Sequence, residues 1–179
     1  MRVTIIGTGN MGRAIAARVL AGGHAVSFVG TYIAQAQELA DEMAGEGDVK
    51  AADRLHGAVA VLAVPYTEAP HVVRTYADQL SGIVIVDPTN PVDLGTVELL
   101  DRAWLGPFSS GGELIEAEAP DDAPFVKAFN TNFAGPLYAG AVDGSPLDAF
   151  VAGNDQTAKD TIMRLASDGG LRAIDAGGL

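Results

Sequence analysis

The stretch that decides the fold is V-T-I-I-G-T-G-N-M-G, residues 3–12. A β-branched run is followed at once by Gly7, Gly9 and Gly12 in the spacing G-x-G-x-x-G. Between a buried strand and a helix, the first glycine permits the tight turn, the second lets a diphosphate approach the backbone, and the third allows close packing of helix on strand. The free amides and the positive end of that helix favour a bound phosphate. The stretch predicts a dinucleotide-binding βαβ unit, and a glycine-rich turn without a ligand is the alternative.

Further apolar runs follow along the chain and alternate with helical patterns. They lie at residues 25–29, 58–64, 83–86, 125–129 and 171–175. Runs that are apolar throughout indicate strands buried on both faces, and their alternation with helices indicates right-handed crossovers in a parallel sheet. We therefore expect an α/β fold with a Rossmann-like, doubly wound and mostly parallel sheet in a single domain over residues 1–179. Residues 92–124, rich in glycine and acidic residues, are expected to form a loop-and-helix excursion from it.

Local signals place several helix ends. Pro70, shortly after Thr67, is typical of the start of a helix, which is expected to pack through Val72, Val73, Tyr76 and Leu80. S-G-G-E at residues 110–113 matches a capping box. Asn154 or Asp155 is expected to cap a last helix that ends at Gly169.

Composition and charge narrow the possible partners and location. Asp and Glu outnumber Lys and Arg by 23 to 11, a net charge of −12, so nucleic acid and anionic lipid are not expected as partners. The chain has no cysteine and three scattered histidines, which argues against a disulfide, a thiolate nucleophile or a metal site. No apolar run approaches the roughly 18 residues of a membrane span, and glycine follows the N-terminus too soon for a signal peptide. These patterns predict a cytoplasmic protein without membrane partners.

The end of the second predicted strand bears on the choice of cofactor. An NAD-dependent enzyme places Asp or Glu there to bind the ribose 2′-hydroxyl, whereas this chain has Gly30, Thr31 and Tyr32. Without a carboxylate to repel a 2′-phosphate, NADP(H) is allowed, and the Thr31 hydroxyl can donate to that phosphate. No Arg or Lys occurs between Arg18 and Lys50 to pair with it. The alternative is that Thr31 merely caps the next helix.

Three unusual loops also fall at predicted strand ends. They are A-V-P-Y at residues 63–66, D-P-T-N-P at 87–91 and F-N-T-N-F at 129–133. In open parallel sheets, ligands bind in the crevice outside the carboxyl ends of the strands. Proline stiffens such loops, while Asn and Thr offer donors and acceptors to a carboxamide. Together the loops predict a crevice that accepts a nicotinamide, although each proline alone can simply mark the end of a strand.

These motifs, in this order, carry a resemblance to a known family. The strings M-R-V-T-I-I-G-T-G-N-M-G, V-L-A-V-P-Y, D-P-T-N-P, V-K-A-F-N-T and G-L-R-A-I-D-A-G resemble the NADPH-dependent coenzyme F420 reductase-like enzymes, or F420H2:NADP oxidoreductases. The resemblance spans nearly the whole chain. It implies a Rossmann domain that binds NADP(H) and transfers hydride between the nicotinamide and a second redox acceptor, a deazaflavin in the coenzyme F420 enzymes.

The resemblance implies site residues in this chain at the positions that match the family's motifs. The diphosphate loop would comprise Gly7, Thr8, Gly9, Asn10, Met11 and Gly12, the 2′-phosphate would meet Gly30, Thr31 and Tyr32, and Ala63, Val64 and Pro65 would lie along the cofactor. The nicotinamide and the acceptor would be lined by Asn90, Pro91, Asn130 and Thr131, which are the candidate catalytic residues.

The chain departs from the family pattern in two places. Family members often carry Ser-Arg where Thr31 and Tyr32 stand, so the preference for NADP is expected to be modest. The family usually continues past D-A-G with a C-terminal helical segment, which bears on acceptor binding and on dimerisation.

Several functional readings stay open from the sequence alone. The first is an NADP-dependent oxidoreductase with a small-molecule acceptor such as coenzyme F420, acting as a monomer or a homodimer. The second is a non-catalytic NAD(P)-binding regulatory or redox-sensing module. The third is an NADPH-dependent reductase of flavin, ferric or imine substrates. Hydride transfer between two cofactors needs no nucleophile, so Lys127 and His71 are expected to be structural rather than proton donors.

Overall fold

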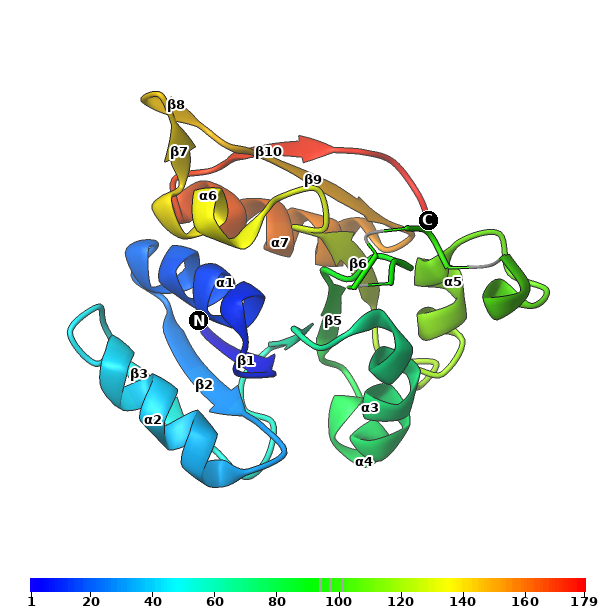
Figure 1. The fold of residues 1–179 in the computed structure, drawn as a ribbon, viewed down its shortest axis with the longest axis horizontal. Coiled ribbons are helices and arrows are strands. Elements are labelled where there is room, and N and C mark those ends of the chain that lie inside the picture. The colour runs from blue at the N-terminus through cyan, green and yellow to red at the C-terminus, as the bar shows by residue number, and fades with distance from the viewer. Residues whose placement is uncertain (94, 97, 101) are drawn as a thin grey trace.

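A single eight-stranded sheet forms the centre of the protein (Figure 1). The computed structural model describes all residues except 94, 97 and 101. The strand order is β10-β9-β6-β5-β4-β1-β2-β3, and all neighbouring strands are parallel except β6 and β9. The strands of this sheet are β1 (Arg2–Ile6), β2 (Ala25–Val29), β3 (Val49–Ala51), β4 (Val59–Leu62), β5 (Val84–Asp87), β6 (Phe125–Ala128), β9 (Asp148–Gly153) and β10 (Arg172–Asp175).

Helices cover both faces of the sheet. One face is packed by α1, α2, α6 and α7, and the other by α3, α4 and α5. The α-helices are α1 (Asn10–Ala21), α2 (Ile33–Met43), α3 (Ala69–Thr75), α4 (Ala77–Leu80), α5 (Gly111–Glu116), α6 (Ala134–Ala139) and α7 (Gln156–Asp168). Short 3₁₀ helices lie at η1 (Tyr66–Glu68) and η2 (Arg102–Leu105), and the hairpin of β7 (Ala141–Val142) and β8 (Ser145–Pro146) stands apart from the main sheet.

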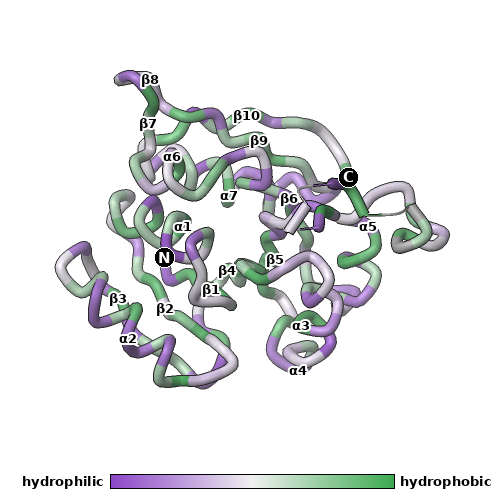
Figure 2. Tube along the Cα trace, viewed as in Figure 1, coloured by the Kyte–Doolittle hydropathy of each residue, from purple (hydrophilic) through white to green (hydrophobic). Residues whose placement is uncertain are grey.

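The apolar strands explain this layered arrangement. Successive side chains of a strand point to opposite faces, so an uninterrupted apolar strand supplies two cores at once. In β1, Val3 and Ile5 pack on the face with α1, whereas Ile6 packs on the face with α3. Figure 2 shows the hydrophobic colour concentrated along the central strands. The structure thus confirms the predicted doubly wound α/β fold.

The order of the strands places a switch point beside β1. From β1 the chain adds β2 and β3 on one side, and it then crosses over to place β4 on the other side of β1. The loops that leave β1 and β4 therefore diverge, which opens a crevice at their carboxyl ends.

Most predicted elements are present, and the structure differs from the expectations at several points. The helix expected after Pro70 is interrupted at Tyr76, so α3 and α4 are separate. Strands β3 and β9 were not predicted. The capping box at Ser110 and Glu113 is confirmed, and Asp155 rather than Asn154 caps α7, accepting a hydrogen bond from the Ala158 amide.

The described residues contain no helix that is both long and apolar enough to cross a membrane.

Candidate functional site

A cavity of about 800 Å³ opens at the carboxyl ends of β1, β4, β5 and β6. It lies at the switch point between β1 and β4, where the fold class predicts a ligand. Nine predicted site residues line it: Gly9, Asn10, Met11, Ala63, Val64, Pro65, Asn90, Asn130 and Thr131. The lining does not include seven others: Gly7, Thr8, Gly12, Gly30, Thr31, Tyr32 and Pro91.

The glycines of the first loop differ in what surrounds them. At Gly9 an added Cβ would meet nothing within 4 Å, and the backbone there is extended, with φ −80° and ψ −176°. At Gly7, where φ is +118°, a Cβ would lie 2.1 Å from the carbonyl oxygen of Ala63. At Gly12 a Cβ would lie 2.6 Å from the carbonyl oxygen of Gly7. The fold itself thus requires Gly7 and Gly12, whereas Gly9 faces open space at the N-terminus of α1.

The residues after β2 lie next to this loop. A Cβ on Gly30 would be 3.2 Å from the methyl carbon of Thr8, so the loops that follow β1 and β2 are in contact. Thr31 is exposed, and Tyr32 is 66% exposed. Tyr32 occupies the cap position of α2 and no side chain caps that helix, so the alternative role of Thr31 as a helix cap is wrong.

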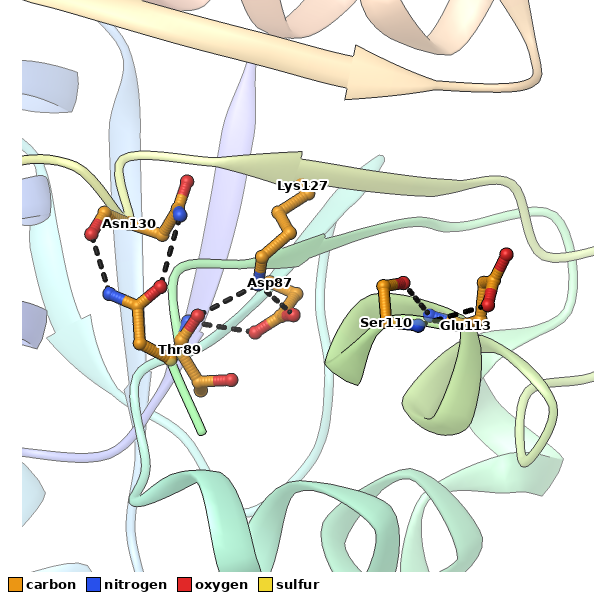
Figure 3. A network of polar contacts seen from close by, with 7 residues as sticks. Asp87, Thr89, Ser110, Glu113, Lys127 and Asn130 are labelled. Carbon is orange, nitrogen blue, oxygen red and sulfur yellow. Dashed lines mark hydrogen bonds and ion pairs between the residues drawn. The ribbon is translucent and has the colours of Figure 1, made fainter. Parts of the chain in front are cut away.

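Two asparagines from neighbouring loops pair at the cavity. Asn90 Nδ2 donates to the backbone carbonyl of Asn130 at 2.7 Å, and Asn130 Nδ2 donates to Asn90 Oδ1 at 3.1 Å (Figure 3). Thr131 lies beside them in the lining. Pro91 does not reach the cavity, and its carbonyl accepts a hydrogen bond from the Leu100 amide. Of the four candidate catalytic residues, three are therefore brought together.

A buried ion pair supports the loop that carries Asn90. Asp87 is fully buried, and its Oδ2 lies 2.7 Å from Lys127 Nζ on β6 (Figure 3). The other oxygen of Asp87 accepts from the Thr89 amide at 2.8 Å, and Lys127 also donates to the Thr89 carbonyl at 2.7 Å. Lys127 is thus engaged in holding the D-P-T-N-P loop, which fits the structural role expected for it.

Among the lining residues that were not predicted as site residues, three stand out: Tyr66, Thr89 and Phe133. Tyr66 and Thr89 are buried, and in the described part of the chain neither hydroxyl has a hydrogen-bond partner. Burial, and secondly the Asp87 carboxylate, raise the pKa of Tyr66 above its ordinary value of 10.0. Phe133, at the start of α6, lines the cavity and is 84% exposed. All three stand in or beside the strand-end loops, but the sequence does not tell which side chains of a loop turn inward.

The residues that line the cavity are suited to orienting bound ligands rather than to reacting with them. The cavity combines a helix N-terminus, an amide pair and apolar walls formed by residues such as Met11, Val64 and Leu100. Such a site can hold two flat rings against each other and exclude water, which is what transfer between two cofactors requires.

Comparisons with known proteins agree with this fold. Residues 2–91 match the family described as NADP oxidoreductase coenzyme F420-dependent. The F420-dependent NADP reductase of Methanocaldococcus jannaschii is 24% identical over 191 residues, covering 100% of this chain and 85% of that protein. A solved hypothetical protein from Sinorhizobium meliloti has a TM-score of 0.85 at 28% identity, covering 99% of this chain and 85% of that one. A proposed F420-dependent NADP reductase from Arthrobacter sp. has a TM-score of 0.78 at 26% identity, covering 98% and 84%.

Proposed function

Since the chain belongs to the family of coenzyme F420-dependent NADP oxidoreductases, we propose that it transfers hydride between NADP(H) and the deazaflavin ring of coenzyme F420. The chain is an NADP-dependent oxidoreductase, as its family and its relatives are. The choice of coenzyme F420 as acceptor, and the residues that serve each ring, are the parts that the proposal adds.

The space at Gly9 is the observation that carries the proposal. The first turn of α1 holds no acidic residue, and its unpaired amides begin where a Cβ would meet nothing within 4 Å. A diphosphate fits there because helix amides and the helix dipole stabilise negative charge. Asn10 and Met11 then flank the diphosphate, and Ala63, Val64 and Pro65 form the wall along which the nicotinamide half extends.

The loop after β2 would hold the adenosine end. Thr31 is exposed beside the contact between Gly30 and Thr8, where its hydroxyl can donate to a 2′-phosphate. The absence of a carboxylate at residues 30–32 removes the repulsion by which NAD-dependent enzymes reject NADP. We therefore expect a preference for NADPH over NADH that is real but modest.

The walls of the cavity suit a flat organic acceptor. A volume of about 800 Å³ lies within the usual range for sites that bind small molecules. Val92 and Leu100 line one part of it and Phe133 another, so that apolar groups can hold a second ring near the nicotinamide. When bound, NADPH supplies the hydride and the deazaflavin accepts it, so the protein needs no nucleophile. No cluster of His, Asp or Glu suited to a metal ion occurs among the described residues.

The Asn90–Asn130 pair would orient the nicotinamide carboxamide. Asn130 Nδ2 donates one of its two hydrogens to Asn90 Oδ1, so Asn130 Oδ1 can accept from the carboxamide and the second Nδ2 hydrogen can donate to it. The pair also fixes the D-P-T-N-P loop against the loop that follows β6.

The test starts with calorimetric titration of the protein with NADPH and NADH. It continues with NADPH oxidation in the presence of oxidised coenzyme F420, a flavin, a ferric chelate and a cyclic imine. Bleaching of coenzyme F420 at the highest rate of the panel is the expected result. Stable NADPH binding without turnover of any acceptor would instead support a regulatory or redox-sensing module.

Variants of Asn130 test its role within this reaction. Asn130→Leu removes the amide at similar volume, and because a misplacement of about 1 Å can cost a hundredfold in rate, turnover should fall far more than NADPH affinity. Asn154→Leu is the matched control, since Asn154 follows β9 and lies outside the cavity. Turnover by Asn130→Leu at the parent rate would remove Asn130 from the site.

A further inference from the structure

Phe129 adopts a backbone conformation that its residue type rarely shows. Its φ is +66°, and it directly precedes Asn130 at the cavity. The other non-glycine residue with positive φ in the described part of the chain is Asp143. Asp143 and Gly144 form the two-residue turn of the β7–β8 hairpin, where such values are favoured. Phe129 occupies no hairpin turn, and a bulky residue with positive φ is an outlier of the kind found at functional sites.

The bend at Phe129 changes which faces residues 129 and 130 occupy. Along β6, Val126 and Ala128 point into the core beneath α1 and α7, while Phe125 points into the core beneath α3 and α5. In a straight strand Phe129 would share the face of Phe125, and Asn130 would follow Ala128 into the core. Instead the Phe129 ring is 2% exposed and packs in the same core as Val126 and Ala128. Asn130 is thereby released to the cavity.

Contacts in the core and in the loop at the cavity hold the Phe129 backbone in this conformation. In the core, the buried ring anchors Phe129. In the loop after β6, the Asn130 backbone carbonyl accepts from Asn90 Nδ2, and the Asn132 backbone amide donates to the Phe129 carbonyl at 3.2 Å. The Asn132 side chain donates to the Asp148 carbonyl at 3.0 Å. The strained residue thus lies between a fixed ring and a fixed loop.

We infer that Phe129 is a positioning residue, whose left-handed backbone presents Asn130 and Thr131 to the nicotinamide. It acts through Asn130 and touches neither ring of the reaction. The inference rests on the proposed function, because it concerns the place of the nicotinamide. If Phe129 served only to fill the core, its backbone conformation would have no bearing on cofactor binding.

A pair of variants separates these two roles. Phe129→Ala and Phe129→Gly both delete the ring, but glycine adopts positive φ freely and alanine does not. For each variant we would measure the affinity for NADPH and for 2′-phospho-ADP-ribose, which is NADP without its nicotinamide. The ratio of the two affinities reports how well the nicotinamide is held, and it cancels effects common to both ligands. We expect a ratio of roughly tenfold for the parent, the size expected of one hydrogen bond and one ring contact. The ratio should approach one for Phe129→Ala and stay near the parent value for Phe129→Gly.

A second pair keeps a core side chain in case deletion of the ring unfolds the protein. Phe129→Leu and Phe129→Ile bury side chains of identical composition, but β-branched isoleucine is the less tolerant of positive φ. The leucine variant should keep the ratio and the isoleucine variant should lose it. If the parent binds NADPH more tightly than 2′-phospho-ADP-ribose but the two variants of each pair give equal ratios, the inference about Phe129 is overturned. The proposed place of the nicotinamide would then still stand. A parent that binds both ligands equally would overturn the proposed place of the nicotinamide, and this inference with it.

Discussion

At the residue scale, two glycines in the loop between β1 and α1 meet opposite requirements. Gly7 has positive φ and faces the Ala63 carbonyl at a distance that excludes a Cβ, so it serves the fold. Gly9 has an extended backbone and open space, so nothing within the protein demands glycine there. A side chain at Gly9 would enter only the space assigned to the diphosphate.

This difference predicts separable effects of substitution. Gly9→Val should abolish NADPH binding while it lowers the free energy of unfolding by about 1 kcal/mol, the usual cost of a poor residue at a helix cap. Gly7→Ala should cost on the order of 3 kcal/mol, because it adds strain and a backbone clash. Calorimetric titration and urea unfolding of both variants provide the check. Undiminished NADPH affinity in Gly9→Val would show that the diphosphate lies elsewhere.

Thr31 makes a second prediction at this scale, on cofactor choice. Thr31→Asp places a carboxylate beside the 2′-phosphate, and like charges about 4 Å apart cost on the order of 1 to 4 kcal/mol between bulk water and a protein surface. NADPH affinity should therefore fall several-fold to several-hundred-fold, while NADH affinity changes little. Thr31→Asn, which adds no charge, is the control. A parent that prefers NADH, or equal losses for both cofactors, would contradict the assignment.

At the scale of elements, the ends of β5 and β6 depend on one buried ion pair. Asp87 is fully buried, and Lys127 is its cation. Removing one member of such a pair is costly because it leaves an uncompensated charge in the interior, whereas removing both is nearly neutral. The pair also fixes Thr89 and hence the loop that carries Asn90.

A double-mutant cycle tests this support. Lys127→Met should lower the free energy of unfolding by about 3 to 5 kcal/mol. The double variant Asp87→Asn, Lys127→Met should recover most of that loss, because an asparagine oxygen can still accept from the Thr89 amide. Urea unfolding of the four proteins gives the coupling energy. A double variant no more stable than Lys127→Met would show that the charge of Asp87 is not what Lys127 compensates.

At the scale of the whole molecule, ion pairs tie the last elements to the sheet of a strongly acidic chain. Lys159 of α7 is buried and lies 2.9 Å from Asp175 Oδ1 at the end of β10. The hydrogen bond from Lys159, and next that from the Gly177 amide, hold the pKa of Asp175 below its ordinary 3.8. A carboxyl with a lowered pKa stabilises the fold above that ordinary value, and the stabilisation is lost as the pH falls through the lowered pKa.

The sign of this linkage predicts a pH-dependent difference between two proteins. Asp175→Asn should lower the thermal midpoint at neutral pH, and the difference from the parent should shrink as the pH falls below 3.8. Asp143→Asn is the matched control, because it removes one negative charge from the exposed hairpin turn and leaves Lys159 paired. A difference that stays constant down to the acid transition would contradict the role assigned to the pair.

The agreement between sequence and structure varies with the range of the interactions involved. The long apolar runs became β1, β2, β4, β5, β6 and β10, and the capping box at Ser110 and Glu113 formed as expected. Strand β9 escaped prediction because its exposure alternates and its partner β6 runs antiparallel to it. The interruption at Tyr76 lies within an otherwise continuous helical pattern, and nothing in the local sequence marks it.

By itself, the sequence determined the fold class and the loops that follow the strand ends. Apolar periodicity and glycine spacing are local properties, and a residue's immediate neighbours suffice to express them. Only the tertiary structure decided that Asn90 meets Asn130, that Asp87 is buried against Lys127, and that Phe129 turns into the core while Asn130 turns out. Those outcomes depend on β5 and β6 lying side by side although some 40 residues of chain separate them, and the burial that sets the cost of a charge or a bent backbone exists only once the sheet has formed.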